Sequence, residues 1–148
     1  MFIRRCLLVV NAVRSISDTS LRSKATVLVV DDDRGTLALF ARFISAAGMD
    51  PIKALSAAEC FQIVQQRPID LIILDLLMPG IDGIDALKEL EKRCAGRKPP
   101  ILGVTSWCVP AVGPLVKSLG AAEVLFKPVF RREFLDRVTM LIERGWKS

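Results

Sequence analysis

One segment indicates the fold most clearly: Asp70-Leu71-Ile72-Ile73-Leu74-Asp75-Leu76-Leu77-Met78-Pro79-Gly80. Residues 71–74 form an unbroken apolar run, which is typical of a strand buried on both faces of a sheet. Asp75 follows the run directly, and Pro79-Gly80 marks a turn soon after it. A carboxylate at the junction of a buried strand and a loop is held on a rigid platform, so Asp75 is the first candidate functional residue.

Three other apolar runs end in the same way. Residues 27–30 are followed by Asp31 and Asp32, residues 101–104 by Thr105, and residues 124–126 by Lys127. If these runs are parallel strands, the polar residues that follow them meet at the edge of the sheet where the strands end. Such sheets bind ligands at this edge. This convergence is the main sequence argument for function.

Helical patterns alternate with these runs. Apolar residues recur at helical spacing over residues 34–47, with Gly48 as the stop, and again over residues 84–94 and 130–144. Ser56 and Glu59 form a capping box that opens a helix through Gln66, and a short strand is expected at residues 51–54. We therefore predict an α/β fold with a doubly wound, five-stranded parallel sheet. Because Pro114 is tolerated only where a helix starts, a loop and a short helix at residues 115–119 are expected after Thr105.

Composition excludes several classes of function. A chain of 148 residues suits one domain, and no apolar stretch reaches the ~18 uncharged residues of a membrane span. The net charge of +5 comes mainly from residues 1–24, which carry +4, so we expect no nucleic-acid-binding surface in the body of the chain. The four cysteines are scattered without a C-x-x-C pair, and histidine is absent, so zinc and His-based chemistry are not expected.

Residues 1–24 are expected to be a poorly ordered N-terminal extension, and residues 25–148 the folded domain. The apolar residues 6–10 after Arg4 and Arg5 resemble the start of a signal peptide, but Asn11 interrupts them and no clear cleavage site follows. A targeting role and a start codon placed too far upstream remain alternatives. The reduced thiols of the body suit the cytoplasm.

Three carboxylates at one edge repel one another, by about 3 kcal/mol per pair at about 5 Å with an effective dielectric of about 20. Lys127 supplies one positive charge, and Mg²⁺ with its preference for hard oxygen ligands would supply the rest. Phosphoryl transfer to an aspartate uses such a set. The candidate roles are as follows: Asp75 as nucleophile, Asp31 and Asp32 as metal-binding acids, Lys127 as cation and Thr105 as hydroxyl donor. Asp33 is instead expected to cap the following helix.

The residues resemble the receiver domain of two-component response regulators over roughly residues 25–146. The most specific match is the D-x-x-M-P-G-x-D-G string from Asp75 to Gly83. The other matching pieces are residues 27–32, Val104-Thr105-Ser106, Gly120-Ala121-Ala122 and Lys127-Pro128. The resemblance implies a flavodoxin-like sheet with strand order 2-1-3-4-5.

The resemblance also implies a phosphorelay role. Asp75 would accept a phosphoryl group from a histidine kinase or a histidine phosphotransfer protein, in agreement with the absence of histidine here. Asp32 and Asp75 would bind Mg²⁺ directly, Leu77 through its backbone carbonyl and Asp31 through water. Since no output domain is expected after residue 146, we predict a single-domain regulator, not a stand-alone enzyme, that signals by contact with an unidentified protein. A weak homodimer is also considered, because the face after Thr105 commonly forms dimers in this family.

Three departures from the family pattern stand out. Val124 occupies the position three residues before Lys127 where the family usually has Tyr or Phe, and prolines interrupt the helix after Thr105. Leu77 and Trp107 lie two residues past Asp75 and Thr105, where side chains control water access to the phosphoaspartate in the family. Two apolar groups there predict slow self-dephosphorylation.

Two other functions remain open. Asp31-Asp32-Asp33 also fits the opening motif of haloacid-dehalogenase-like phosphatases, with Thr105 as their second motif, although the late acidic pair is missing. Such an enzyme would be phosphorylated on Asp31. The second alternative is a receiver-like binding module that works without phosphorylation. Val124 and the interrupted helix after Thr105 favour it, and the intact Asp31, Asp32, Asp75, Thr105 and Lys127 oppose it.

Overall fold

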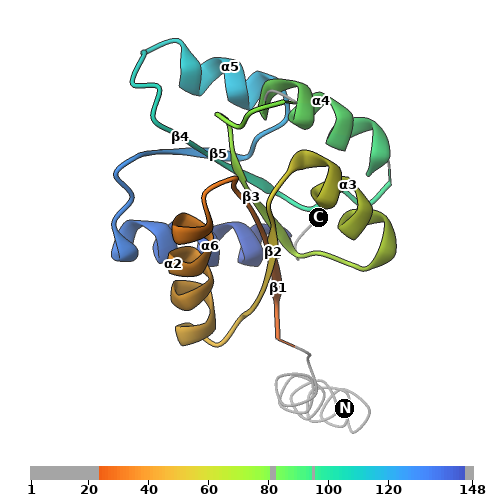
Figure 1. The fold of residues 1–148 in the computed structure, drawn as a ribbon, viewed down its shortest axis with the longest axis vertical. Helices are drawn as coiled ribbons and strands as arrows, with labels where there is room; N and C mark the ends of the chain where they lie inside the picture. Colours follow the sequence, from red (N-terminus) through yellow and green to blue (C-terminus); the bar gives the residue numbers. More distant parts are fainter. Residues whose placement is uncertain (1–23, 81–82, 95, 146–148) are drawn as a thin grey trace, which may run out of the picture.

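The computed structural model describes residues 24–80, 83–94 and 96–145. Nearly all of the expected N-terminal extension, residues 1–23, lies outside the described residues, and so does Trp146. Five strands alternate with five helices along the described chain (Figure 1). The strands are β1 (Thr26–Val30), β2 (Asp50–Ala54), β3 (Leu71–Asp75), β4 (Ile101–Thr105) and β5 (Glu123–Phe126). The helices are α2 (Arg34–Ala46), α3 (Ala57–Gln66), α4 (Gly83–Arg93), α5 (Val112–Ser118) and α6 (Arg131–Gly145).

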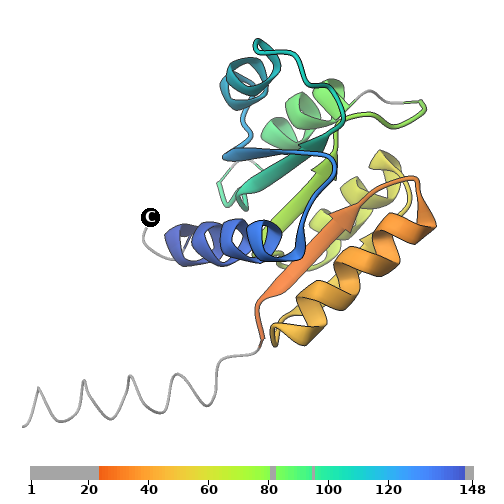
Figure 2. The ribbon, with the colours of Figure 1, turned by 90° about the vertical axis from the view of Figure 1, so that its left-hand side faces the viewer.

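The strands form one sheet in the order β2-β1-β3-β4-β5, and all neighbouring pairs are parallel. The predicted α/β fold with a doubly wound, flavodoxin-like sheet is confirmed. Helices α3, α4 and α5 cover one face of the sheet, and α2 and α6 cover the other (Figures 1 and 2). All strand ends therefore meet at one edge, and all strand starts at the opposite edge.

The two-sided covering explains the continuous apolar runs. In β1, Leu28 and Val30 pack into the core beneath α3, α4 and α5, whereas Val27 and Val29 pack into the core beneath α2 and α6. All four side chains are at most 1% exposed. A strand in this setting has no face left for polar residues, so its polar side chains appear only where it ends.

The predicted helix caps are present. The carboxylate Oδ2 of Asp33 accepts hydrogen bonds from the backbone N–H of Thr36 at 2.9 Å and from its hydroxyl at 2.7 Å. Ser56 Oγ accepts the N–H of Glu59 at 3.2 Å, and the Glu59 carboxylate accepts the N–H of Leu55 at 2.8 Å. The N–H groups of Thr36 and Glu59 lie in the first turns of α2 and α3, where they have no partner within the helix, so these side chains supply one.

The expected start of α5 was wrong by three residues, since the helix begins at Val112 and not at residue 115. Pro114 is the third residue of the helix. The first four N–H groups of a helix have no intrahelical partner, so a proline costs no hydrogen bond there. Among the described residues, no helix is long and apolar enough to cross a membrane.

Candidate functional site

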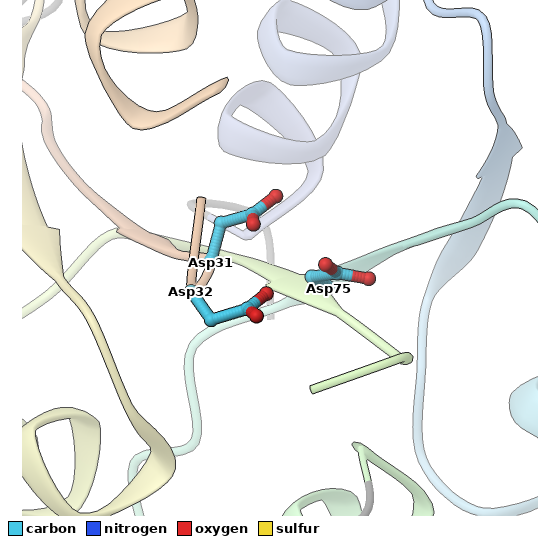
Figure 3. Close-up of side chains that lie close together, drawn as sticks. All are labelled: Asp31, Asp32 and Asp75. Atoms are coloured by element: carbon cyan, nitrogen blue, oxygen red, sulfur yellow. The ribbon is translucent and has the colours of Figure 1, made fainter. Parts of the chain in front are cut away.

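The predicted site residues lie together at the edge where the strands end. Asp31 and Asp32 follow β1, and Asp75 is the last residue of β3. One carboxylate oxygen from each of the three lies within 4.8 Å of the others, and Figure 3 shows the three side chains around one small space. We call Asp31, Asp32 and Asp75 the acidic cluster.

Two members of the acidic cluster are buried and one is exposed. The exposed fractions of Asp31 and Asp75 are 2% and 5%, whereas Asp32 lies in solvent. Oδ1 of Asp31 accepts the N–H of Asp33 at 2.9 Å, and Oδ1 of Asp75 accepts the N–H of Leu77 at 3.0 Å. Each of these carboxylates is therefore fixed through one oxygen, which leaves the other oxygen for a different partner.

That partner is Lys127, which follows β5. Its Nζ lies 3.5 Å from Oδ2 of Asp31 and 3.5 Å from Oδ2 of Asp75. The pKa of Asp31 is raised to about 6, mainly by burial. The hydrogen bond from Asp33 and the charge of Lys127 lower this pKa, and the charge of Asp75 raises it. One ammonium group therefore does not balance the charge of the acidic cluster.

Thr105 completes the set at the end of β4. Its side chain is fully buried, and its hydroxyl oxygen accepts the N–H of Trp107 at 3.0 Å. Asp75 pairs with Val104 in the sheet, so Thr105 lies one residue beyond the level of Asp75 on the next strand. The backbone N–H of Lys127 donates to the carbonyl of Thr105 at 2.8 Å, which ties β5 to the same edge.

The donor set fits a hard divalent cation. Carboxylate oxygens within one small space are the ligands that Mg²⁺ prefers, and the exposure of Asp32 leaves a path from solvent. The backbone of Leu77 begins the loop after β3, where its N–H is bonded to Asp75. The role of the Leu77 carbonyl stays a prediction.

The sequence interpretation missed the structural role of Gly83, the first residue of α4. A Cβ atom at this position would lie 2.4 Å from the Cα of Leu76 and 2.7 Å from its carbonyl oxygen. Only glycine lets α4 begin this close to the segment that follows Asp75. The signal was present in the sequence, since Gly83 closes the string that begins at Asp75.

The departures from the family pattern are visible beside the site. Val124 is partly buried and packs against the core beneath α3, α4 and α5. Trp107 is 40% exposed, and Leu77 is partly buried. Thus one large apolar side chain stands at the surface next to Thr105.

Known proteins share this architecture. The family model of the response regulator receiver domain matches residues 27–139. The polar-differentiation response regulator DivK of Brucella ovis is 24% identical over 113 residues, which cover 76% of this chain and 92% of DivK. The transcriptional regulatory protein CpxR of Klebsiella pneumoniae is 30% identical over 119 residues, which cover 80% of this chain and 50% of CpxR.

Solved structures agree with the sequence relatives. A putative response regulator from Chloroflexus aurantiacus superposes with a TM-score of 0.77 at 29% identity, over 82% of this chain and 100% of that one. The chemotaxis protein CheY4 of Vibrio cholerae gives a TM-score of 0.75 at 26% identity, over 80% of this chain and 99% of CheY4. The matched segment runs from the second residue of β1 through the other four strands and contains the acidic cluster, Thr105 and Lys127. The chain therefore belongs to the response regulator receiver domain family.

Proposed function

We propose that Asp75 accepts a phosphoryl group from a histidine of a partner protein, which is a histidine kinase or a histidine phosphotransfer protein. The observation that carries this proposal is the position of Asp75. It is 5% exposed, fixed through Oδ1, and 3.5 Å from Lys127 through Oδ2. A carboxylate that is held in this way loses little freedom when it attacks phosphorus in line.

The chain's own residues have separate tasks in this transfer. An oxygen of Asp75 attacks phosphorus, the bond from phosphorus to the donor's histidine nitrogen breaks, and that nitrogen keeps the electron pair. Lys127 lies close enough to Asp75 to neutralise negative charge on the transferred group. Thr105 offers its hydroxyl to a phosphoryl oxygen from the neighbouring strand end. The product is a mixed anhydride on Asp75.

Mg²⁺ fits this proposal as the cofactor. Asp31, Asp32, Asp75 and the carbonyl of Leu77 would hold the ion, and when bound it supplies the positive charge that Lys127 alone does not provide. Asp33 is already engaged in capping α2 through Thr36, so it is left out of the ligand set.

The domain would then pass its signal to another protein by direct contact. The relatives named above are response regulators, and DivK matches this chain over 92% of its own length. We propose the same kind of single-domain signalling here, with phosphoryl acceptance but without the turnover of a stand-alone enzyme.

Reductive trapping tests the proposal. The protein is treated with acetyl phosphate and Mg²⁺ or with a phosphorylated histidine kinase, reduced with labelled borohydride and mapped by mass spectrometry. Label is expected on Asp75 and is expected to disappear in Asp75→Asn. The matched control is Asp136→Asn in the exposed face of α6, which should label normally. Label on Asp31 would point to the phosphatase alternative, and no label at any aspartate would refute phosphoryl acceptance.

A second candidate function rests on Val124. A partly buried valine packed against the core has no large ring that could change position when Thr105 moves. A receiver-like module that binds its partner without phosphorylation would suit such a residue. Equal partner affinity for the unmodified protein, its phosphorylated form and Asp75→Ala would favour this candidate over the phosphorelay role.

A further inference from the structure

The edge where β3, β4 and β5 begin carries a second surface feature, opposite to the acidic cluster. Two recesses of about 350 and 430 Å³ lie there and share Ile69, Asp70, Arg97 and Pro99, so they form one continuous depression. The end of α6 borders the first recess through Leu141 and Arg144. We call this depression the basic groove.

The lining of the basic groove is apolar at the bottom and cationic at the rim. Ile69, Pro99 and Leu141 supply apolar surface, and both Pro99 and Leu141 are buried. Of the described residues in the lining, one is acidic, namely Asp70, and five are cationic. The cationic residues are Arg67, Arg93, Arg97, Lys98 and Arg144.

Two of these cations form no ion pair with any described residue. Arg97 and Arg144 are exposed and form no ion pair within the part of the chain that the structure describes. The other three are paired with acids outside the groove lining: Arg67 with Asp50 at 3.9 Å, Arg93 with Glu89 at 2.8 Å, and Lys98 with Glu91. The surplus positive charge therefore belongs to Arg97 and Arg144, both of which line the first recess.

Asp70, the acidic residue in the described part of the lining, is hydrogen-bonded within the fold. Oδ2 of Asp70 accepts the backbone N–H of Thr26 at 2.7 Å, at the start of β1. This hydrogen bond ties the start of β1 to the residue before β3, and Asp70 forms no ion pair with any described residue. An external anion is the partner that would satisfy the guanidinium groups of Arg97 and Arg144.

We propose that the basic groove binds an acidic segment of another protein that also carries apolar side chains. The free guanidinium groups select carboxylates, and the apolar bottom selects aliphatic side chains next to them. A nucleic acid fits less well, because none of the described residues that line the groove is aromatic and no base could stack there. A flat lipid surface would not reach the apolar bottom of a depression.

The site is independent of phosphoryl acceptance, because it lies at the other edge of the sheet. It gives the domain a second contact with a partner, separate from any surface that responds to Asp75. Failure of this proposal and failure of the phosphorelay proposal are therefore distinguishable.

The test uses the full chain and a short fluorescein-labelled peptide of alternating glutamate and leucine pairs. We expect saturable binding by fluorescence anisotropy, with amide shift changes at Ile69, Arg97 and Arg144. The double variant Arg97→Glu with Arg144→Glu should weaken binding by about tenfold or more. Arg42→Glu, an exposed reversal on α2, and Asp75→Asn should both bind like the unchanged protein.

Four comparison probes decide the specificity: the same peptide with lysine for glutamate, the same peptide with serine for leucine, a single-stranded oligonucleotide, and phosphatidylserine vesicles. Both altered peptides should bind more weakly. The proposal is overturned if no saturable binding occurs, if the shifts map elsewhere, or if the oligonucleotide or phosphatidylserine vesicles bind more tightly than the peptide. If the double variant melts at a lower temperature, Arg144→Gln alone replaces it, and unchanged peptide affinity in that variant also overturns the proposal.

Discussion

At the edge where the strands end, Asp31 and Asp75 are 2% and 5% exposed and share Lys127. At the edge where the strands begin, Arg97 and Arg144 lie in solvent without an acidic partner among the described residues. Buried charges depend on one another, because removing one leaves another uncompensated in a medium that solvates it poorly. Exposed charges are solvated individually, so each can be changed at little cost. Substitutions at the first edge should therefore have large, coupled effects and those at the second edge small ones.

The largest expected effect is the loss of phosphoryl acceptance when Lys127 is removed. Lys127→Ala should slow labelling of Asp75 by about 10²- to 10³-fold, in line with the loss of one preorganised electrostatic contact. Lys92→Ala, which removes an exposed cation in the last turn of α4, is the matched control and should label at the normal rate. Rates follow from timed acetyl phosphate reactions. If both variants are labelled at the same rate, the positive charge of Lys127 does not govern phosphoryl transfer to Asp75.

The next effect concerns the backbone that supports the acidic cluster. Gly83→Ala would place a Cβ atom 2.4 Å from the Cα of Leu76, so the backbone must shift, and we expect a loss of about 3 kcal/mol in the free energy of unfolding. Gly113→Ala is the control, because no neighbouring atom lies within 4 Å of a Cβ there. It lies in helix α5 and should be neutral or stabilise by about 0.5 kcal/mol. Urea unfolding of both variants measures the difference, and similar midpoints would contradict the close approach.

Mg²⁺ should relieve the excess negative charge of the acidic cluster. The pKa of Asp31 is raised from 3.8 to about 6, so the folded state binds more protons than the unfolded state between these values. The contribution of Asp31 to stability therefore falls as pH rises through this window, and above about pH 6 its full cost is present. About 10 mM Mg²⁺ with a dissociation constant of about 1 mM stabilises by about 1.4 kcal/mol, which should raise Tm by about 4 °C near pH 7.5.

The same measurement near pH 5 should give a smaller shift, because protons then compete with the ion for Asp31. Differential scanning fluorimetry with Ca²⁺-free buffers at both pH values checks this, with Asp75→Asn as the variant that lowers the response. A Tm that does not change with Mg²⁺ at either pH would show that the acidic cluster is not a cation site.

A smaller effect is expected at Trp107, which is 40% exposed beside Thr105. If its ring limits the approach of water to phosphorylated Asp75, then Trp107→Ala should speed phosphate loss by about threefold, equivalent to about 0.6 kcal/mol of barrier. Val109→Ala, at another exposed apolar residue of the same loop, should leave the rate unchanged. Phosphate release after removal of the donor gives both rates. An unchanged or slower loss in Trp107→Ala contradicts the shielding.

The sequence alone predicts the site at the edge where the strands end, but not the basic groove at the edge where the strands begin. The reason is physical. Asp75 and Thr105 end their strands, and Asp31 and Lys127 directly follow theirs, so the parallel sheet alone brings these residues together. Arg97 and Arg144, by contrast, lie on a loop and on the last turn of α6. Nothing in their local sequence predicts that they share a groove, because tertiary packing of α6 against the sheet places them there.

Local boundaries show the same limit. The start of α5 was placed three residues too late, because Pro114 was read as the first possible helical residue, whereas any position in the first turn accepts it. Similarly, the close approach of Gly83 to Leu76 depends on how α4 docks on the sheet. Strand ends are fixed by burial and are visible in the sequence; helix starts in loops depend on contacts that are distant in sequence.

The smallest expected change in stability is at the edge where the strands begin. Arg67 pairs with Asp50 at 3.9 Å, and the two side chains are 50% and 53% exposed. Water solvates both charges, and holding two long side chains together costs rotamer entropy, so Arg67→Gln should change the free energy of unfolding by less than about 0.5 kcal/mol. Asp50→Asn and the double variant complete a thermodynamic cycle in urea. A coupling energy near zero is expected because the pair is loose and exposed. A parallel cycle with Lys127→Ala, Asp31→Asn and their double variant should give a clearly larger coupling energy. Equal coupling energies in the two cycles would contradict the contrast between a buried, interdependent pair and an exposed, replaceable one.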